Sequence, residues 1–383
     1  MSNKSAATLL KVVESHDAGD VMNFSIRKKA LDRVRKSVSR ISVDSSEKVE
    51  RPAVTVIDSK MTPLEASTLL WECNVMGAPV YNAESETYIG MFDARDILSC
   101  VIAAHKEFEA LGGHHHNPGE DTHMVNDVEI HIDDHKTRRD LIAKALQHIK
   151  INSKPQSPGA VTVSYLAARN PMTPFMTKDS SLLEVCKVLA CRQKHRVPIT
   201  DSSSGKNSCI GIISQSGLVA FIASKCPPGS LDVKMVDAGL EYKKDVVKIS
   251  DDASASDAFE LLDSHRLSGI AVVDEDGKLI GNTSARDIKN AVMDAGRTNM
   301  DMDILSYLAR VRQSQLMQND KYPSCHVHED ATVAHVVNLL AKTGYHRVFV
   351  VDEDMKPLGL SALPISSSSS LRKAVNEFRL PSI

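Results

Sequence analysis

One short pattern returns four times along the chain and constrains its fold more than any other feature. In each copy an amphipathic segment leads through a short polar turn into an apolar run, and a strand containing glycine follows. The four copies read STLLWECNVMGAPVYN, CKVLACRQKHRVPITD, FELLDSHRLSGIAVVD and VNLLAKTGYHRVFVVD. Chance does not explain so many matching positions, so the chain is interpreted as an internal repeat.

The register of the copies is set by four reference positions, which are Pro79, Pro198, Ala271 and Phe349. Apolar pairs precede them by ten and nine residues, at Leu69-Leu70, Val188-Leu189, Leu261-Leu262 and Leu339-Leu340. Three residues after them stand Asn82, Asp201, Asp274 and Asp352. A glycine follows in every copy, at Gly90, Gly211, Gly281 and Gly359. The spacing therefore predicts the same elements, in the same order, four times.

Helical spacing of apolar residues beside capping Thr, Ser or Asp predicts helices over 63–74, 181–194, 255–264 and 332–343. The β-branched runs GIAVVD and RVFVVD predict strands that helices cover, and turns such as DEDGK join them to the glycine strands. One copy is too small to bury its own helix faces. We therefore expect an α/β (α+β) fold in which βαβ-type copies pair.

Composition bounds the class of protein. The chain has 383 residues, 42% hydrophobic side chains and a net charge of −3, which is typical of two globular domains and gives no basic field for nucleic acid. Its seven cysteines are scattered and none is in CxxC spacing, so a reducing compartment is expected. No run of 18 apolar residues occurs. We expect neither secretion nor membrane insertion, and a cytoplasmic location, with the nucleus left open as a second one.

Three regions of the chain are predicted. Residues 1–50 form a basic tail that includes IRKKALDRVRKSVSRIS, which is either solvated and flexible or a docking and phosphorylation segment. Residues 51–225 hold copies one and two, with a His-rich insertion at about 105–160 that contains a helix over 135–149. Residues 226–383 hold copies three and four, where the serines at 366–370 interrupt the last helix. The histidines at 105, 114–116, 123, 131 and 135 have no rigid ligand spacing, so no metal site is predicted.

The repeat resembles the cystathionine-β-synthase (CBS) domain, a βαββα unit that pairs head to head into a Bateman module. Four copies without a catalytic domain resemble the gamma regulatory subunit of AMP-activated protein kinase, over roughly residues 51–380. The resemblance is sharpest in TNMDMDILSYLARVRQ and in CHVHEDATVAHVVNLLAKTGYHRVFVVDEDMKPLG. It implies four CBS repeats paired as two Bateman modules in a disk-like molecule.

The resemblance also implies nucleotide-binding residues. The family places a Ser or Thr three residues after the glycine and a ribose-binding Asp six residues after it, which selects Asp93 and Asp96 in copy one and Ser284 and Asp287 in copy three. The family's His-Arg phosphate grip corresponds to His195-Arg196 and His346-Arg347. Ser268 could line the third cleft. This suggests about two sites: Asp96 with His195 and Arg196, and Ser284 and Asp287 with His346 and Arg347. One alternative is that the His-Arg pairs face the neighbouring module. A second is that each of these Asp residues only caps a helix.

The function implied is an adenine-nucleotide-sensing regulatory subunit that binds AMP, ADP or ATP and partners the alpha-type catalytic and beta-type scaffold subunits of a protein kinase. The sequence departs from the kinase gamma subunit at three places, which weakens the expectation that the two proteins bind nucleotides alike. Met76 replaces a basic residue, Ser216-Gly217 replace a Lys beside an Arg, and Ile365 replaces an Asp. A nucleotide-independent scaffold and a free-standing sensor are the alternatives. No P-loop, GxSxG or HExxH motif is present, so an enzyme is not expected.

Overall fold

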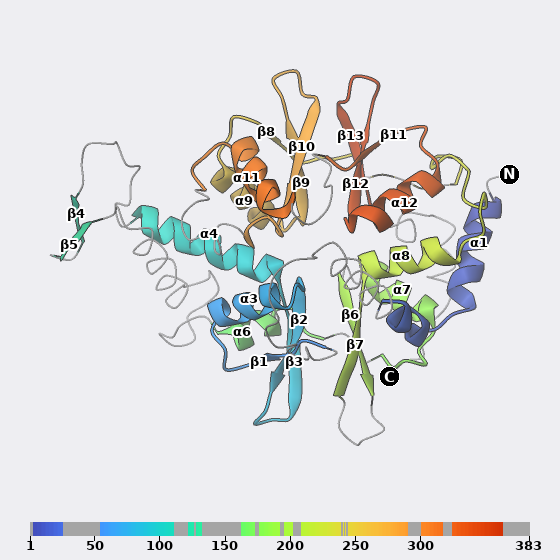
Figure 1. Cartoon of the computed structure of the whole chain (residues 1–383), viewed down its shortest axis with the longest axis horizontal. Helices are drawn as coiled ribbons and strands as arrows, with labels where there is room; N and C mark the ends of the chain where they lie inside the picture. The colour runs from blue at the N-terminus through green and yellow to red at the C-terminus, as the bar shows by residue number, and fades with distance from the viewer. Residues whose placement is uncertain are drawn as a thin grey trace, which may run out of the picture.

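The computed structural model describes residues 3–25, 54–110, 122–125, 128–131, 162–172, 176–191, 195–201, 208–238, 240, 242, 244–289, 300–316 and 324–362. The basic stretch after residue 25, the histidines at 114–116, the helix expected over 135–149, Ile365 and the serines at 366–370 lie outside these residues. Within them the chain has a mixed α/β fold, as predicted, with four small sheets arranged around a common centre (Figure 1). A fifth sheet, formed by β4 (Thr122–Val125) and β5 (Val128–His131), lies apart from them (Figure 1).

The four repeats share a helix followed by two strands, and the elements that flank these three differ among them. The first repeat consists of β1 (Ile57–Asp58), α3 (Pro63–Glu72), β2 (Gly77–Asn82), β3 (Thr87–Asp93) and α4 (Ala94–Ala110). The second consists of α7 (Leu182–Cys191), β6 (Arg196–Asp201), β7 (Ser208–Ser214) and α8 (Gln215–Lys225). The third consists of β8 (Lys248–Ser250), α9 (Ala255–Ser264), β9 (Gly269–Val273) and β10 (Leu279–Ser284), and the fourth of β11 (His326–His328), α12 (Val333–Thr343), β12 (Arg347–Val351) and β13 (Pro357–Ala362).

Each sheet pairs its strands in the same way. The first strand runs parallel to the second, and the second is antiparallel to the third, as in β1, β2 and β3. In the second repeat the first strand is reduced to a bridge between Met176 and Ile199. The parallel pair requires a crossover, and the helix between the two strands provides it.

The helices begin where their caps predict. Thr62 and Ser254 form capping boxes with Glu65 and Asp257, and the Thr332 side chain accepts the His335 N–H at 3.2 Å. Helix α9 has the predicted bounds, and α12 begins one residue after its cap. Helix α3 ends two residues early, at Glu72.

A segment that precedes one repeat covers its partner in each pair. The residues after α1 (Asn3–Glu14) lie on the second repeat, where Ala18 N donates to Ser180 O at 2.9 Å. Helix α6 (Val163–Ala168) precedes the second repeat but packs on the first. The 231–240 segment lies on the fourth repeat, and α11 (Ile304–Leu316) packs on the third. This exchange ties repeat one to repeat two and repeat three to repeat four.

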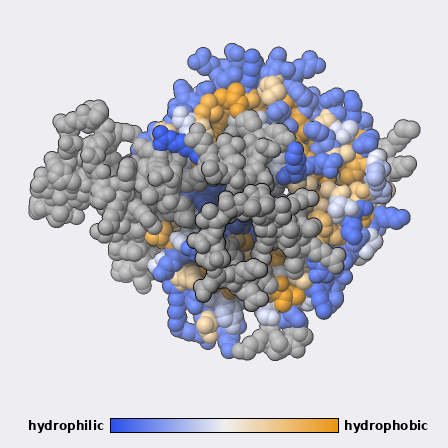
Figure 2. Space-filling view, viewed as in Figure 1, coloured by the Kyte–Doolittle hydropathy of each residue, from blue (hydrophilic) through white to orange (hydrophobic). Residues whose placement is uncertain are grey.

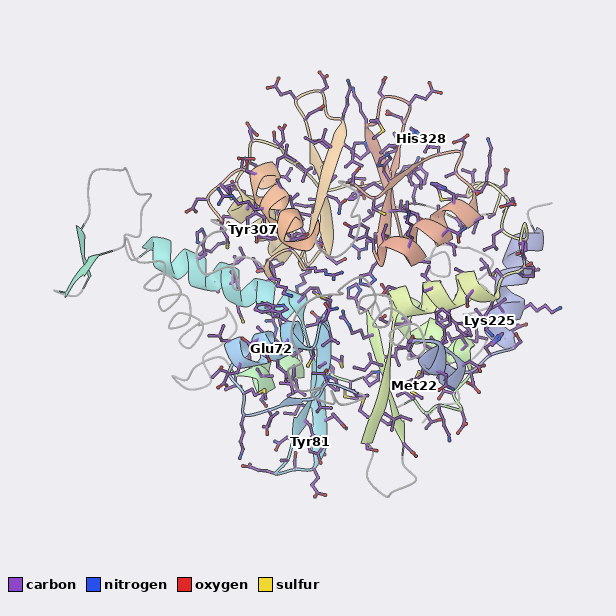
Figure 3. The ribbon with its side chains drawn as sticks, viewed as in Figure 1. Met22, Glu72, Tyr81, Lys225, Tyr307 and His328 are labelled. Carbon is purple, nitrogen blue, oxygen red and sulfur yellow. The ribbon has the colours of Figure 1, made fainter. Side chains whose placement is uncertain are left out.

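The exchange explains the repeated glycine. A Cβ added at Gly90 would overlap the backbone oxygen of Ala167, and one at Gly359 would overlap the ring of Tyr242. At Gly211 it would meet the sulfur of Met22, which lies on the second repeat (Figure 3). At Gly90 the backbone of the covering segment therefore leaves no room for a side chain, whereas at Gly211 and Gly359 the obstacle is a side chain of the covering segment.

Replacement of Gly90 by Ala is expected to destabilise the protein by about 3 kcal/mol or more, at the upper end of overpacking costs, because backbone atoms of 167–170 cannot move aside without detaching the segment. Urea unfolding monitored by circular dichroism measures this cost. Gly277→Ala is the comparison, since Gly277 has φ +79° and open space around it, and only left-handed strain of about 1–2 kcal/mol applies there. Equal losses in the two variants would contradict the crossing argument.

The two pairs are also joined across the molecule. One apolar cluster contains buried residues of repeats one and three, including Leu98 and Phe259, and its helices α4 and α9 pack together. A second cluster contains repeats two and four, including Phe221 and Leu340, where α8 packs on α12. Hydrophilic residues cover much of the outer edge of the molecule (Figure 2). The four repeats therefore form one body around a centre that no single repeat encloses.

Candidate functional site

A cavity of about 540 Å³ lies where the four repeats meet. This volume falls within the range of small-molecule sites. Charged and imidazole groups from all four repeats line it, namely Asp93, Arg95, His195, Arg196, Arg286, Asp287, His346 and Arg347. Apolar side chains line other parts of the wall, among them Val75, Ile212, Phe349 and Leu360. The cavity thus combines cations with apolar surface.

Sheet topology brings these charges to one edge. In the odd repeats Asp93 ends β3, and Arg286 and Asp287 follow the end of β10. In the even repeats Arg196 begins β6 and Arg347 begins β12. Because the middle strand is antiparallel to the last one, the start of one strand and the end of the other lie at the same edge of the sheet. That edge faces the centre in every repeat.

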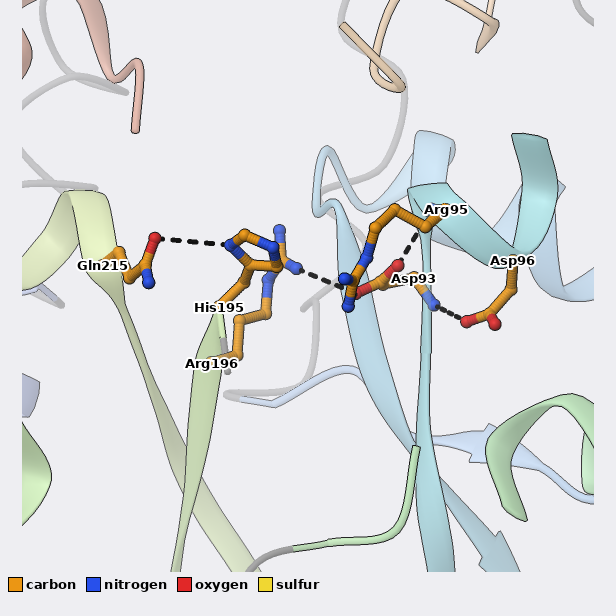
Figure 4. A network of polar contacts seen from close by, with 6 residues as sticks. All are labelled: Asp93, Arg95, Asp96, His195, Arg196 and Gln215. Carbon is orange, nitrogen blue, oxygen red and sulfur yellow. Dashed lines mark hydrogen bonds and ion pairs between the residues drawn. The ribbon is translucent and has the colours of Figure 1, made fainter. Parts of the chain in front are cut away.

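Asp93 is the buried anion of this centre (Figure 4). Its Oδ2 lies 3.5 Å from Nη2 of Arg95 and 3.8 Å from Nη1 of Arg196, and its Oδ1 accepts the Arg95 N–H at 2.9 Å. Burial alone would raise the pKa of Asp93, but the two guanidinium groups outweigh burial and hold it below its usual value. The carboxylate is therefore ionised and paired with cations from two repeats.

The two histidines lie close together in the centre. The rings of His195 and His346 have centroids 5.8 Å apart, and Nδ1 of His195 lies 3.3 Å from Oε1 of Gln215. Burial, together with nearby arginines, lowers the pKa of His195 to about 4 and that of His346 to about 3. Nδ1 of His346 is buried and has no hydrogen-bond partner among the described residues. Both rings are neutral at pH 7, and an entering anion would favour their protonated forms.

The two predicted sugar-binding carboxylates occupy different surroundings. Asp287 lines the cavity with Ser284 and Ser268, and its Oδ2 accepts Ser284 N–H at 2.8 Å and Ser284 O–H at 3.0 Å. Asp96 accepts the Asp93 N–H at 2.8 Å but is not among the residues lining the cavity. Burial, and then the charge of Asp93, raises the pKa of Asp96 to about 8. Asp96 therefore caps the helix of the first repeat, and Asp93 faces the cavity in its place.

The structure therefore places eight of the nine predicted site residues at one cavity, and Asp96 behind it. The expected arrangement was one site per module, with Asp96 beside His195 and Arg196. The observed ion pair of Arg196 is with Asp93, and the His-Arg pairs of both modules share the centre. The ion pair lies within the first module, as expected, whereas the contact between the two histidines joins the modules, as in the alternative arrangement.

Comparison with known proteins identifies the fold of the repeats. The sequence model of the CBS domain matches residues 239–294 and 315–360. The second half of the chain contains a pair of CBS domains. The crystal structure of protein MJ1225 from Methanocaldococcus jannaschii, a proposed archaeal homolog of g-AMPK, has a TM-score of 0.54 at 13% identity, and the match covers 83% of this chain and 95% of that one. The similarity shows that all four repeats have the CBS-type fold.

Curated relatives carry a different name from a kinase gamma subunit. "Protein SDS23" of Candida albicans is 24% identical over 263 residues, which cover 64% of this chain and 40% of the relative. "Protein SDS23" of Scheffersomyces stipitis is 26% identical over 271 residues, which cover 64% of this chain and 50% of the relative. The chain thus spans half or less of the length of these relatives.

Two cavity arginines were missed by the sequence reasoning. Arg95 and Arg286 stand five residues after the glycines of the first and third CBS repeats, in DARDIL and SARDIK. Their matched register was visible, but the Arg beside each Asp reads as part of an exposed helix start. Only the assembled repeats turn both toward the centre.

Among the described residues no helix has the length and apolarity needed to cross a membrane. No group of three or more His, Cys, Asp or Glu side chains in the described ranges has the geometry to hold a metal ion.

Because His195 and His346 are neutral in the folded protein, we expect its stability to fall in acid. Each has a folded pKa below the ordinary value of 6.5, so the unfolded chain binds protons that the folded chain excludes. The free energy of unfolding should therefore fall as the pH drops from about 6.5 to about 4 for His195, and further toward 3 for His346. Thermal unfolding across this range should show a shallower loss for His195→Gln/His346→Gln. The exposed His335→Gln is the control, and the same pH profile in all three proteins would refute the prediction.

Proposed function

We propose that this chain is a non-catalytic regulatory protein that binds an adenine nucleotide in the cavity between its CBS repeats. The observation that carries the proposal is the gathering of four arginines, Arg95, Arg196, Arg286 and Arg347, at one cavity with apolar walls. A guanidinium fork binds phosphate oxygens in a bidentate manner, and apolar walls suit a base. The hydroxyls of Ser268 and Ser284 and the carboxylate of Asp287 offer partners for a ribose at the third repeat.

Regulation follows if the ligand changes how the repeats are arranged. Each of the four arginines belongs to a different repeat, so a phosphate held by several of them links repeats that are otherwise joined by helix packing. A nucleotide with different affinities for two arrangements shifts their populations. The surface that a partner protein binds would change with the arrangement of the repeats.

A second part of the proposal concerns which protein this chain regulates. The resemblance of the His-Arg pairs and of the second half to a kinase gamma subunit supports a kinase as the regulated protein. The relatives named SDS23 do not carry a kinase name. Copurification of the tagged chain with alpha-type catalytic and beta-type scaffold subunits tests this assignment independently of nucleotide binding.

Nucleotide binding is tested with the intact chain. Isothermal titration calorimetry with AMP, ADP and ATP is expected to show saturable binding, and thermal unfolding is expected to shift upward with each bound nucleotide. GMP and inorganic phosphate separate recognition of the base from recognition of the anion. No heat and no shift with any adenine nucleotide would contradict the proposal and favour a nucleotide-independent scaffold.

A further inference from the structure

The first repeat carries an acid where two other repeats carry a serine. Three residues after the repeat glycine stand Ser214 in the second repeat, Ser284 in the third and Asp93 in the first. Ser214 accepts the N–H of Gly217 at 3.1 Å as a helix cap. Asp93 makes a comparable local bond, since it accepts the N–H of Arg95. The backbone needs only an oxygen at this position, so the charge of Asp93 requires another explanation.

That charge lies in the central cavity. Side chains of Asp93 and Arg196 are only 8% and 14% exposed, and the carboxylate contacts guanidinium groups from the first and second repeats. A Cβ at Gly77 would lie 2.7 Å from the Asp93 Cβ and 3.2 Å from Nη1 of Arg196, so the pair is packed against the start of β2. Carboxylate and phosphate oxygens occupy the same positions on an arginine fork. Asp93 thus takes up the cations that a phosphate would use.

The charges of the cavity can be counted. Four arginines face two carboxylates, Asp93 and Asp287, and both histidines are neutral at pH 7. Two positive charges remain. A phosphate monoester carries about −1.5 to −2 at pH 7, which matches this balance. Each further phosphate adds negative charge that competes with Asp93 for Arg95 and Arg196.

We propose, on the basis of the nucleotide-binding function above, that Asp93 is an internal counter-ion that makes the cavity select nucleoside monophosphates over triphosphates. A longer phosphate chain must either leave its outer charges unpaired or displace the buried carboxylate from Arg95 and Arg196. Displacement leaves Asp93 buried without a cation, which is costly. A monophosphate needs neither change.

The test measures the affinities of the full chain for AMP and ATP by calorimetry. The wild type is expected to prefer AMP. Asp93→Asn keeps the oxygen that accepts the Arg95 N–H and removes the charge, and it is expected to raise the ratio of ATP affinity to AMP affinity about tenfold, a change of about 1.4 kcal/mol. Asp274→Asn is the matched control, because it removes one negative charge at a hairpin turn outside the cavity and should leave the ratio unchanged.

A second variant keeps the test decisive if loss of Asp93 impairs folding. Arg286 lines the cavity from a solvent-exposed position, so Arg286→Gln leaves no buried charge unpaired. It should shift the ratio the other way, toward AMP. A wild-type preference for ATP, or an unchanged ratio in a folded Asp93→Asn variant, would overturn the inference while leaving the proposed function intact. Absence of binding by the wild type to both nucleotides contradicts the proposed function itself.

Discussion

Replacing Arg286 and Arg347 together by Met is expected to abolish nucleotide binding while leaving the protein folded. Both guanidinium groups line the central cavity, from the third and fourth repeats, whereas Asp93 pairs with the other two arginines. Each charge-assisted hydrogen bond to a phosphate contributes about 1.5–3 kcal/mol, so the loss of two such contacts should weaken AMP binding at least 100-fold. Calorimetry with AMP measures the effect directly.

The control must remove the same charge without touching the cavity. Lys60 and Lys278 pair with Glu84 and Asp276 at exposed positions, and a Lys60→Met/Lys278→Met variant lowers the net charge equally. It should bind AMP like the wild type. Unchanged affinity in the double arginine variant, with normal thermal unfolding, would show that the nucleotide binds elsewhere. An equal loss of AMP affinity in both variants would show that the effect comes from the overall charge of the protein.

Much of the fold followed from the repeat because its determinants are local. Caps such as Thr62 with Glu65, apolar spacing and β-branched runs act over a few residues, and they set the helices and strands close to their observed bounds. The glycine was visible as a repeated position, although its reason was not. That reason lies in a covering segment from elsewhere in the chain, such as Ala167 over Gly90.

The site was harder to predict because it depends on how the repeats assemble. The family resemblance, applied to the register of the repeats, selected the His-Arg pairs and Asp287, which do line the cavity. It did not distinguish Asp93 from Asp96, since both stand near a helix start and both accept backbone N–H groups. Which one meets a cation depends on Arg196, a residue of another repeat that is more than 100 positions away. The sharing of one centre by both modules has the same origin.

Tyr307→Ala is expected to be among the most destabilising single changes in the second module. Tyr307 is fully buried on α11, the helix that precedes the fourth repeat and covers the third (Figure 3). Its ring packs edge-on against Phe259 of α9, with centroids 5.3 Å apart, and its hydroxyl donates to the backbone oxygen of Asp287 at 2.9 Å. Truncation of a buried aromatic side chain costs about 3–5 kcal/mol. Urea unfolding gives this value.

Tyr307→Phe separates packing from the hydrogen bond, because it keeps the ring and loses only the hydroxyl. We expect a stability loss of about 1 kcal/mol, with AMP affinity reduced as the backbone of Asp287 loses its anchor beside the cavity. A Phe variant with wild-type stability and wild-type affinity would show that the hydroxyl does not position Asp287. If the Ala variant lost less than about 1 kcal/mol, the covering helix would not be part of the core of the third repeat, and the exchange between repeats would be structurally dispensable.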